Sequence, residues 1–336
     1  MKSFAWNLWD DTEHFELGDS GARPGVWREQ KALFLEKINA PVFLREPLLF
    51  DRFRLQAEVS IPRQVGFVGL VFGALDSQNY ELVYLAPEEI QYDPIMNGSM
   101  TWQIYNGPRY QKPYSYKTGE WLKLSVEVHP EGAFVYVGED PVPQLTLPTL
   151  QHGGSPGKIG FWGYLPAYIR NLSVEEIPPR PIAEADAAAS LSADLVTAWV
   201  VSEPYASSSS EPKAIEQGKE VRTEENGTLN INRLYEARQG LSIQAQSTIT
   251  CAAATESLLS IDFSDQLRLW VNEEEVYQGE WRWSPPSSDG RIRSNHASIP
   301  VRWRAGVNTI RAELTNQEAF GWGMCVRTGL SKEQLM

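Results

Sequence analysis

The sequence predicts an all-β protein built from two antiparallel β-sandwich (jelly-roll) domains. The main observation is a run of short segments in which apolar and polar residues alternate, as over residues 53–61 and again over 122–128. A period of two places one side of a strand in a core and the other side in water. Turn-forming pairs such as Asn97-Gly98 and Asn106-Gly107 separate these segments. Strands that alternate with turns in this way are typical of a sandwich.

A proline-rich stretch at residues 178–181 divides the chain, because proline cannot donate a hydrogen bond inside a sheet. We therefore predict a first sandwich over residues 1–178, a linker over 179–192 and a jelly roll over 193–330. The Ala-, Glu- and Asp-rich part of the linker, 183–192, favours a short helix. A serine-rich stretch at 206–212 is predicted to be a mobile loop. Strands of the second domain are expected at 195–201, 228–232, 242–251, 258–263, 267–271, 299–303, 309–314 and 324–326.

The formal net charge of −13 argues against two classes of partner. A chain this acidic repels the phosphates of nucleic acids and the anionic surface of a membrane. No apolar stretch is long enough to span a bilayer, and residues 1–11 lack the apolar segment of a secretory signal. The sequence as written predicts a cytoplasmic protein, or an extracellular one if a signal has been removed.

The two cysteines are predicted to be free thiols. Cys251 shares a strand face with apolar residues such as Ile249, so we expect it to be buried. Cys325 alternates onto the opposite face, that of Arg327. This difference in parity argues against a disulfide, and the histidines show none of the spacings typical of zinc sites.

Four segments of the first domain, in register, carry a resemblance to a known family. They read FDRFRLQAEVSI at 50–61, GFVGLVFGALDSQNYELVYL at 66–85, GEWLKLSVEV at 119–128, and GKIGFWGY with AYIRNLSV over 157–174. Together they resemble the concanavalin A-like lectin/glucanase superfamily in its laminin-G-like branch. The resemblance covers residues 25–177. It implies a sandwich that binds carbohydrates in many members and hydrolyses them in some.

The second domain resembles the galactose-binding-like jelly roll. The segments that carry this resemblance are FSDQLRLWVNEEEVYQGEW at 263–281, RAGVNTIRAELTN at 304–316 and GWGMCVR at 321–327. The resemblance implies an accessory carbohydrate-binding module of the kind found in glycan-active enzymes. Glu273-Glu274 stands where many relatives have glycine, so the hairpin turn is expected to differ there.

No complete catalytic motif is present. The spacing Glu-x-Asp-x-x-Glu of laminarinase-like enzymes is absent, which argues against a retaining glycosidase of that type. A related hydrolase branch keeps a glutamate in the strand that matches residues 53–61, and Glu58 occupies that place, although the branch's second element is replaced by residues 66–69. Glu58 is thus a candidate catalytic acid/base, or alternatively a solvated strand carboxylate. The stretch at 153–157 matches the serine-hydrolase elbow in spacing only, because Pro156 has no N–H for an oxyanion.

The binding candidates of the first domain are aromatic and polar residues between 92 and 110. Strand parity predicts that Trp102 and Ile104 face the core while Gln103 and Tyr105 face outward together. Sugar sites combine an aromatic plane with amides or carboxylates for the hydroxyls. The alternative is that these tyrosines only cover a loop. The full set of candidates is Tyr92, Asp93, Asn97, Gln103, Tyr105 and Tyr110.

In the second domain, two pairs of residues are binding candidates. Trp281 and Trp283 fall on one side of an extended run, and Trp270 and Asn272 face opposite to the apolar residues Leu269 and Val271. Either pair is a stacking platform or a packing contact between the domains. The one cofactor considered is a structural Ca²⁺, with Asp265, Asp289 and Glu318 as candidate ligands by loop position.

Carbohydrate recognition is the function that the sequence favours, with a glycan as the expected partner and with no nucleic acid and no membrane. Two alternatives stay open. The first is a glycan-active hydrolase with Glu58 as its acid/base, and the second is a non-catalytic structural or interaction scaffold.

Overall fold

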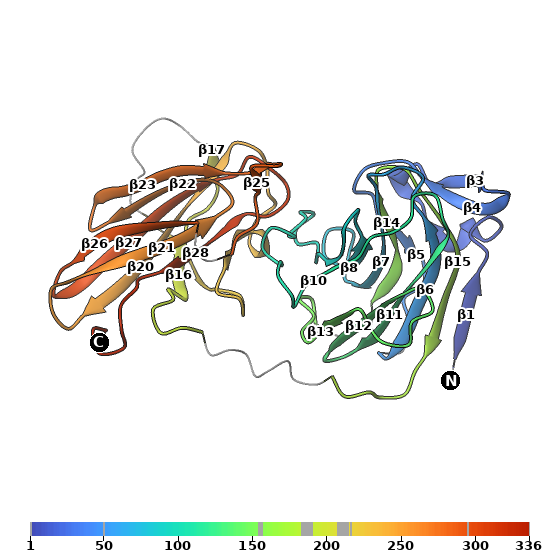
Figure 1. The fold of residues 1–336 in the computed structure, drawn as a ribbon, viewed down its shortest axis with the longest axis horizontal. Coiled ribbons are helices and arrows are strands. Elements are labelled where there is room, and N and C mark those ends of the chain that lie inside the picture. Colours follow the sequence, from blue (N-terminus) through green and yellow to red (C-terminus); the bar gives the residue numbers. More distant parts are fainter. Residues whose placement is uncertain are drawn as a thin grey trace. The chain divides into compact units, whose positions relative to one another are not determined.

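The computed structural model in Figure 1 describes residues 2–49, 51–153, 157–182, 191–206, 215, 217–293 and 296–335. The all-β prediction is confirmed, because every pairing between strands is antiparallel and the described residues hold only three short 3₁₀ helices, Thr12–His14, Gly18–Ser20 and Ile231–Arg233. The predicted helix at 183–192, the serine-rich loop at 206–212 and the turn at 153–157 fall largely outside the described residues. Within those residues, no helix has the length and apolar character needed to cross a bilayer.

The chain forms two compact units, which do not follow the sequence in a simple order. The first unit is Met1–Ile95 with Gly107–Ala185, and the second is Met96–Asn106 with Asp186–Met336. The sequence analysis had assigned residues 96–106 to the first domain.

The first unit contains two sheets. The eight-stranded sheet has the order β13-β12-β11-β6-β15-β4-β3, with β1 also paired to β15, and the seven-stranded sheet has the order β10-β9-β8-β7-β14-β5-β2. The bounds of the eight-stranded sheet are β1 Ser3–Trp6, β3 Arg23–Trp27, β4 Gln30–Leu35, β6 Phe53–Ser60, β11 Leu122–His129, β12 Gly132–Val137, β13 Leu145–Leu147 and β15 Ala167–Glu176. Those of the seven-stranded sheet are β2 Phe15–Glu16, β5 Val42–Leu44, β7 Phe67–Ala74, β8 Glu81–Leu85, β9 Glu89–Tyr92, β10 Gln111–Pro113 and β14 Lys158–Tyr164.

Strand β6 shows why this sequence folds as a sandwich. Leu55, Ala57 and Val59 are at most 2% exposed and face the core, whereas Gln56 and Glu58 between them are partly exposed. The period of two therefore gives the eight-stranded sheet one apolar inner face and one polar outer face.

The second unit also has two main sheets. The larger has the order β18-β16-β20-β27-β22-β23, with β17 paired to β20, and the smaller has the order β19-β28-β21-β26. Strands of the larger sheet are β16 Ala198–Val201, β17 Tyr205–Ala206, β18 Lys219–Arg222, β20 Leu241–Cys251, β22 Asp265–Val271, β23 Glu274–Trp281 and β27 Gly306–Thr315. Strands of the smaller are β19 Leu229–Asn230, β21 Thr255–Phe263, β26 Ala297–Trp303 and β28 Gly323–Arg327, and a separate hairpin pairs β24 Trp283–Ser284 with β25 Ser288–Asp289.

The hairpin between β22 and β23 turns on Asn272 and Glu273. Val271 pairs with Glu274, which leaves a two-residue loop, and the φ angles of the two loop residues are 50° and 73°. Positive φ at both positions is the requirement of the tight turn that matches the twist of paired strands. Asparagine meets it readily and glutamate does not, so the turn keeps the usual length with an unusual second residue.

Both cysteines are free and buried. Cys251 lies in the apolar core as expected, and Cys325 is 2% exposed although it pairs with Asp262 on the outer side of β28. Burial raises the pKa of the Cys325 thiol to about 11 and also raises the pKa of Cys251.

Thiol titration tests this arrangement. We expect two thiols to react when unreduced protein is unfolded, and neither to react rapidly in the native protein at neutral pH, because the reactive thiolate is disfavoured by burial. Finding no thiol in the unfolded, unreduced protein would show instead that the two cysteines pair.

Candidate functional site

The outer face of the eight-stranded sheet in the first unit is unusually polar near the middle of β6. Across the sheet, Glu58 stands beside Lys123 of β11 and Arg170 of β15, and Gln56 stands beside Ser173 of β15. Because all these positions share the parity opposite to the core residues of β6, their side chains face away from the sandwich interior.

A bulge in β15 opens this face. Arg170 pairs with Glu58 and Ser173 pairs with Gln56, so β15 holds one residue more than β6 between these pairs. Asn171 is exposed with a φ of 53°, while Leu172 is fully buried. On its other edge β15 pairs with β4 before the bulge and with β1 after it. The bulge therefore lies where this edge of β15 changes its partner from β4 to β1, and bulges often redirect side chains toward a site.

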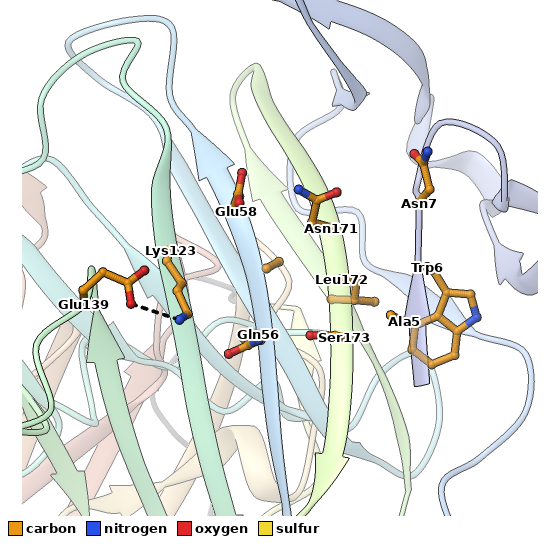
Figure 2. Close-up of a pocket in the computed structure, with 11 residues that line it drawn as sticks. Ala5, Trp6, Asn7, Gln56, Glu58, Lys123, Glu139, Asn171, Leu172 and Ser173 are labelled. Atoms are coloured by element: carbon orange, nitrogen blue, oxygen red, sulfur yellow. Dashed lines mark hydrogen bonds and ion pairs between the residues drawn. The ribbon is translucent and has the colours of Figure 1, made fainter. Parts of the chain in front are cut away.

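A hollow of about 430 Å³ lies at the bulge. Figure 2 shows Glu58 on β6, Asn171 on β15 and Asn7 directly after the end of β1. Gln56 and Ser173 lie lower in the same view. The hollow is lined by Ala5, Trp6, Asn7, Gln56, Ala57, Glu58, Lys123, Glu139, Asn171, Leu172 and Ser173.

The charged groups of the hollow are matched in pairs. Arg170 binds the Glu58 carboxylate at 2.5 Å and donates to Gln30 at 2.5 Å. Lys123 pairs with Glu139 at 3.3 Å, the contact drawn as a dashed line in Figure 2. The lining is thus close to neutral, which suits an uncharged polar ligand.

Three other polar side chains of the hollow make no hydrogen bond within the described part of the chain. These are the amides of Gln56 and Asn171 and the hydroxyl of Ser173, all of which line the hollow and are drawn in Figure 2. Amides and hydroxyls supply both donors and acceptors. They are therefore available to a ligand with hydroxyl groups.

Trp6 lines the hollow, and other aromatic side chains lie around Arg170 and Tyr168 on the outer face of the sheet. The guanidinium of Arg170 lies 4.4 Å from the ring centre of Trp121, and Trp27 and Tyr168 stack with their ring centres 5.2 Å apart. Phe34 also packs against Tyr168, with the ring centres 4.9 Å apart. Aromatic faces beside polar groups are the combination that recognises sugar rings.

The far end of this face is occupied by the chain itself. Arg180, in the segment after β15, donates to Glu127 at 3.1 Å and to the hydroxyl of Tyr136 at 2.5 Å, and it lies 4.0 Å from the ring centre of Phe134. Glu127 also binds Arg54. These contacts cover the part of β11 and β12 around Glu127, outside the hollow.

The carboxylates of the hollow are not arranged like a glycosidase pair. Such enzymes need an acid kept protonated by a desolvated site and a second carboxylate across the scissile bond. Here Glu58 is held by Arg170, and Glu139 is paired with Lys123 and has a side chain that is 84% exposed. The structure thus places Glu58 in the site, but as part of an ion pair.

Several predicted binding residues of the first unit lie in its interior. Tyr92 and Asp93 are fully buried and Tyr110 is 2% exposed. The hydroxyl of Tyr92 donates to Glu81 at 2.6 Å, and that of Tyr84 lies 3.4 Å from Asp93. The tyrosines therefore fill a core, the alternative to a sugar site that the sequence left open.

The prediction that Gln103 and Tyr105 face outward is wrong. Both are fully buried in the second unit, whereas Trp102 is half-buried against Phe320. The reason is that this segment is a turn, in which the N–H groups of residues 104 and 105 both bond to the carbonyl of Thr101. The strand period of two does not apply to a turn.

Residues 96–106 are bound into the second unit through their backbone and side chains. Gln103 accepts from the N–H of Ile292 at 2.8 Å and donates to the carbonyl of Phe320 at 3.1 Å. Asn97 donates to the carbonyl of Asn232 at 2.7 Å. Buried backbone groups need such partners, so these polar residues, predicted as sugar ligands, serve packing.

The aromatic candidates of the second unit are divided by exposure. Trp270 is 5% exposed, because Arg268 and Arg311 both lie over its ring, so it offers no open face for stacking. Trp281 is half-buried against His296, with ring centres 4.3 Å apart. Trp283 is 53% exposed, and it alone of these three presents a free ring. Asn272 is used in the hairpin, where it bonds to Asn308 and to the N–H of Thr309.

The calcium candidates are occupied by N–H donors. Asp265 accepts from Asn316 at 3.0 Å and from the N–H of Glu318 at 2.8 Å, and Asp289 pairs with Arg293. Among the residues that the structure describes, no group of three or more His, Cys, Asp or Glu side chains is placed to hold a metal. The donor set does not fit a Ca²⁺ site, which needs several free oxygens.

Comparison with known proteins gives weak structural likenesses. No protein-family model and no curated protein matches the sequence. The carbohydrate-binding module CBM66 from Bacillus subtilis is 13% identical, with a TM-score of 0.38 over 48% of this chain and 96% of that one. A Bacillus subtilis protein of unknown function with a galectin-like fold is 11% identical, with a TM-score of 0.38 over 53% and 96%. A glycosyl hydrolase from Parabacteroides distasonis, described as putative, is 13% identical, with a TM-score of 0.37 over 52% and 94%. Similarity at this level does not establish a function.

Proposed function

We propose that the hollow at the β15 bulge binds a neutral sugar residue of a glycan. The observation that carries this proposal is that Gln56, Asn171 and Ser173 place unpaired polar groups beside a charge-balanced frame. A sugar presents several hydroxyls and little charge, so it matches this set of groups. The resemblance of the sequence to a concanavalin A-like lectin sandwich, followed by a galactose-binding-like jelly roll, is in line with this proposal.

Substitution of the free amides tests the proposal. We expect Gln56→Ala and Asn171→Gly each to weaken glycan binding by about tenfold, since each removes hydrogen bonds worth roughly 1–1.5 kcal/mol. Glycine is used at residue 171 because it accepts the φ of 53°. A glycan array selects the oligosaccharide, and calorimetry on the full chain measures affinity.

The matched control is Gln78→Ala, which removes an exposed glutamine of the same unit outside the hollow. It should leave the affinity unchanged. If no glycan binds at millimolar concentration, or if Gln56→Ala and Asn171→Gly both bind like the wild type, the hollow is not a sugar site. The scaffold alternative then takes its place.

Glu58→Gln separates binding from hydrolysis on the same oligosaccharide. In a binding protein this change weakens the contact with Arg170 and alters affinity modestly, while the oligosaccharide stays intact with wild type and variant alike. A hydrolase would instead shorten the oligosaccharide, and Glu58→Gln would slow that turnover by orders of magnitude while binding persisted. Product analysis beside the calorimetry decides between the two.

A further inference from the structure

The outer face of the larger sheet in the second unit carries an arginine whose charge is not matched. Along one row across this sheet, Val200 of β16 pairs with Gln246 of β20, Gln246 pairs with Arg311 of β27, and Arg311 pairs with Trp270 of β22. Neighbouring residues in strand sequence, such as Ala312, are fully buried in the core. The row therefore lies on the side of the sheet that faces away from the core.

Arg311 differs from the arginine next to it. Arg268 pairs with Glu275 at 2.7 Å and approaches Glu313 at 3.9 Å. Arg311 forms no ion pair with any residue that the structure describes, its Nε is buried without a partner, and its guanidinium lies 4.9 Å from the ring centre of Trp270. The chain has a net charge of −13, so carboxylates are plentiful. Even so, no described carboxylate lies within ion-pair distance of the half-buried Arg311.

The ring of Trp270 holds this guanidinium in place. Stacking on an aromatic face fixes the plane of an arginine and leaves its outer N–H groups free to bind in that plane. A guanidinium with free, oriented donors is suited to a carboxylate, which it binds through two parallel hydrogen bonds.

The row beside Arg311 is suited to the rest of a sugar. Gln246 is half-buried and makes no side-chain hydrogen bond within the described residues, and Val200 beyond it is 36% exposed. Thr248 and Thr309 form the next pair on the same face, two residues along each strand from Gln246 and Arg311. From Val200 to Arg311 the row spans two strand spacings, about 10 Å. Across the sheet, the row thus offers an apolar contact at Val200, then the amide of Gln246 with the threonine hydroxyls beside it, and then the cation of Arg311.

We propose that this face binds an acidic sugar, with the carboxylate of a uronic acid on Arg311 and its hydroxyls on Gln246 and the two threonines. The unpaired guanidinium of Arg311 suits an anion, and the polar row beside it suits the hydroxyls of a saccharide. This site is separate from the hollow of the first unit, and neither proposal depends on the other.

Calorimetry of the full chain with short oligomers of galacturonate, glucuronate and mannuronate tests this site. We expect at least one series to bind, and its methyl ester, which keeps the shape and loses the charge, to bind at least tenfold more weakly. Arg311→Gln should cause a similar loss, and Arg311→Lys an intermediate one, because lysine keeps the charge without the planar fork. The comparison of acid with ester on the wild type needs no variant, so it holds even if a substitution disturbs folding.

The control is Arg222→Gln, which removes the same charge from β18 on the same face without touching the row. It should change affinity less than twofold, and Gln56→Ala of the first unit should not change it. The proposal is overturned if no oligouronate binds at millimolar concentration, if acid and ester bind equally, or if Arg222→Gln weakens binding as much as Arg311→Gln. Displacement of the sugar by an equal concentration of inorganic phosphate would also overturn it, because it would reveal a simple anion site.

Discussion

Tyr105→Ala is expected to destabilise the second unit by about 3–5 kcal/mol, the usual cost of deleting a buried aromatic side chain. Tyr105 is fully buried. Its hydroxyl is 3.3 Å from the Nδ2 of Asn230 and 3.2 Å from Arg233, which is itself bound to Glu224. Removing the ring therefore leaves a cavity and also removes the hydrogen bonds that the hydroxyl makes with Asn230 and Arg233. Burial raises the pKa of Tyr105 well above its usual value, so the hydroxyl stays neutral in this network.

The loss is measured by urea titration with hydrogen exchange, read in peptides from β20 and β27 so that the second unit is followed by itself. Tyr105→Phe keeps the ring and should cost only about 1–2 kcal/mol, the value of the lost hydrogen bonds. Trp102→Ala is a control within the same segment, because its larger side chain is only half-buried. If Tyr105→Ala costs less than Trp102→Ala, the placement of residues 96–106 in the second unit is wrong.

The second large effect is a loss of stability as the pH rises, caused by Asp265. This side chain is fully buried, and burial raises its pKa to about 8, against the opposing hydrogen bonds from the N–H groups of Gln317 and Glu318 and from Asn316. A carboxyl whose folded pKa lies above its unfolded value binds more protons in the folded state. Its contribution to stability is therefore fully present at acid pH, below the unfolded value, and is lost as the pH rises through about 8.

We expect the free energy of unfolding of the second unit to fall by several kcal/mol between about pH 4 and pH 8, since each pKa unit corresponds to about 1.4 kcal/mol. Hydrogen exchange at a series of pH values measures it in peptides from β22. Asp265→Asn should flatten this slope, whatever its effect on stability at a single pH, because the variant has no proton to lose there.

Asp289→Asn is the matched control of opposite sign. Burial acts to raise the pKa of Asp289. Hydrogen bonds from Arg293 and from the N–H of Arg291 act in the opposite direction and together outweigh it, so the pKa of Asp289 is lowered. Its contribution to stability is present above the unfolded pKa and is lost on acidification. The variant should therefore lose stability near neutral pH and little at acid pH. A wild-type profile with no fall toward pH 8 would show that Asp265 is ionised at little cost.

Much of the fold could be predicted from local pattern. The alternation in β6 and β11 predicted one buried and one wet face, and the strands expected in the second unit at 242–251 and 309–314 appear as β20 and β27. Alternation is a local signal, because the pleat of a single strand decides which side chains share a face. The same parity placed Glu58 on the open side of its sheet, where the structure also has it.

Parity failed where the chain leaves the sheets. Gln103 and Tyr105 were assigned to an outer face by counting, but the turn at Thr101 removes the period of two. Trp270 was predicted to face away from Leu269 and Val271 as part of a stacking platform, but its ring is closed off because two arginines from β22 and β27 lie over it. No spacing in the sequence indicates that the two cations would cover it.

The sequence by itself determined the all-β class, the two faces of each strand and the acidic charge of this protein, since each depends on composition or on neighbours along one strand. Only the tertiary structure decided where the two candidate sites lie. The hollow needs a bulge at Asn171 and residues from β1, β6, β11 and β15 brought together, and the unmatched charge of Arg311 depends on which carboxylates its neighbouring strands supply. Both features arise from pairing between distant segments, and the register of that pairing is set by the packing of the whole sheet rather than by any one strand.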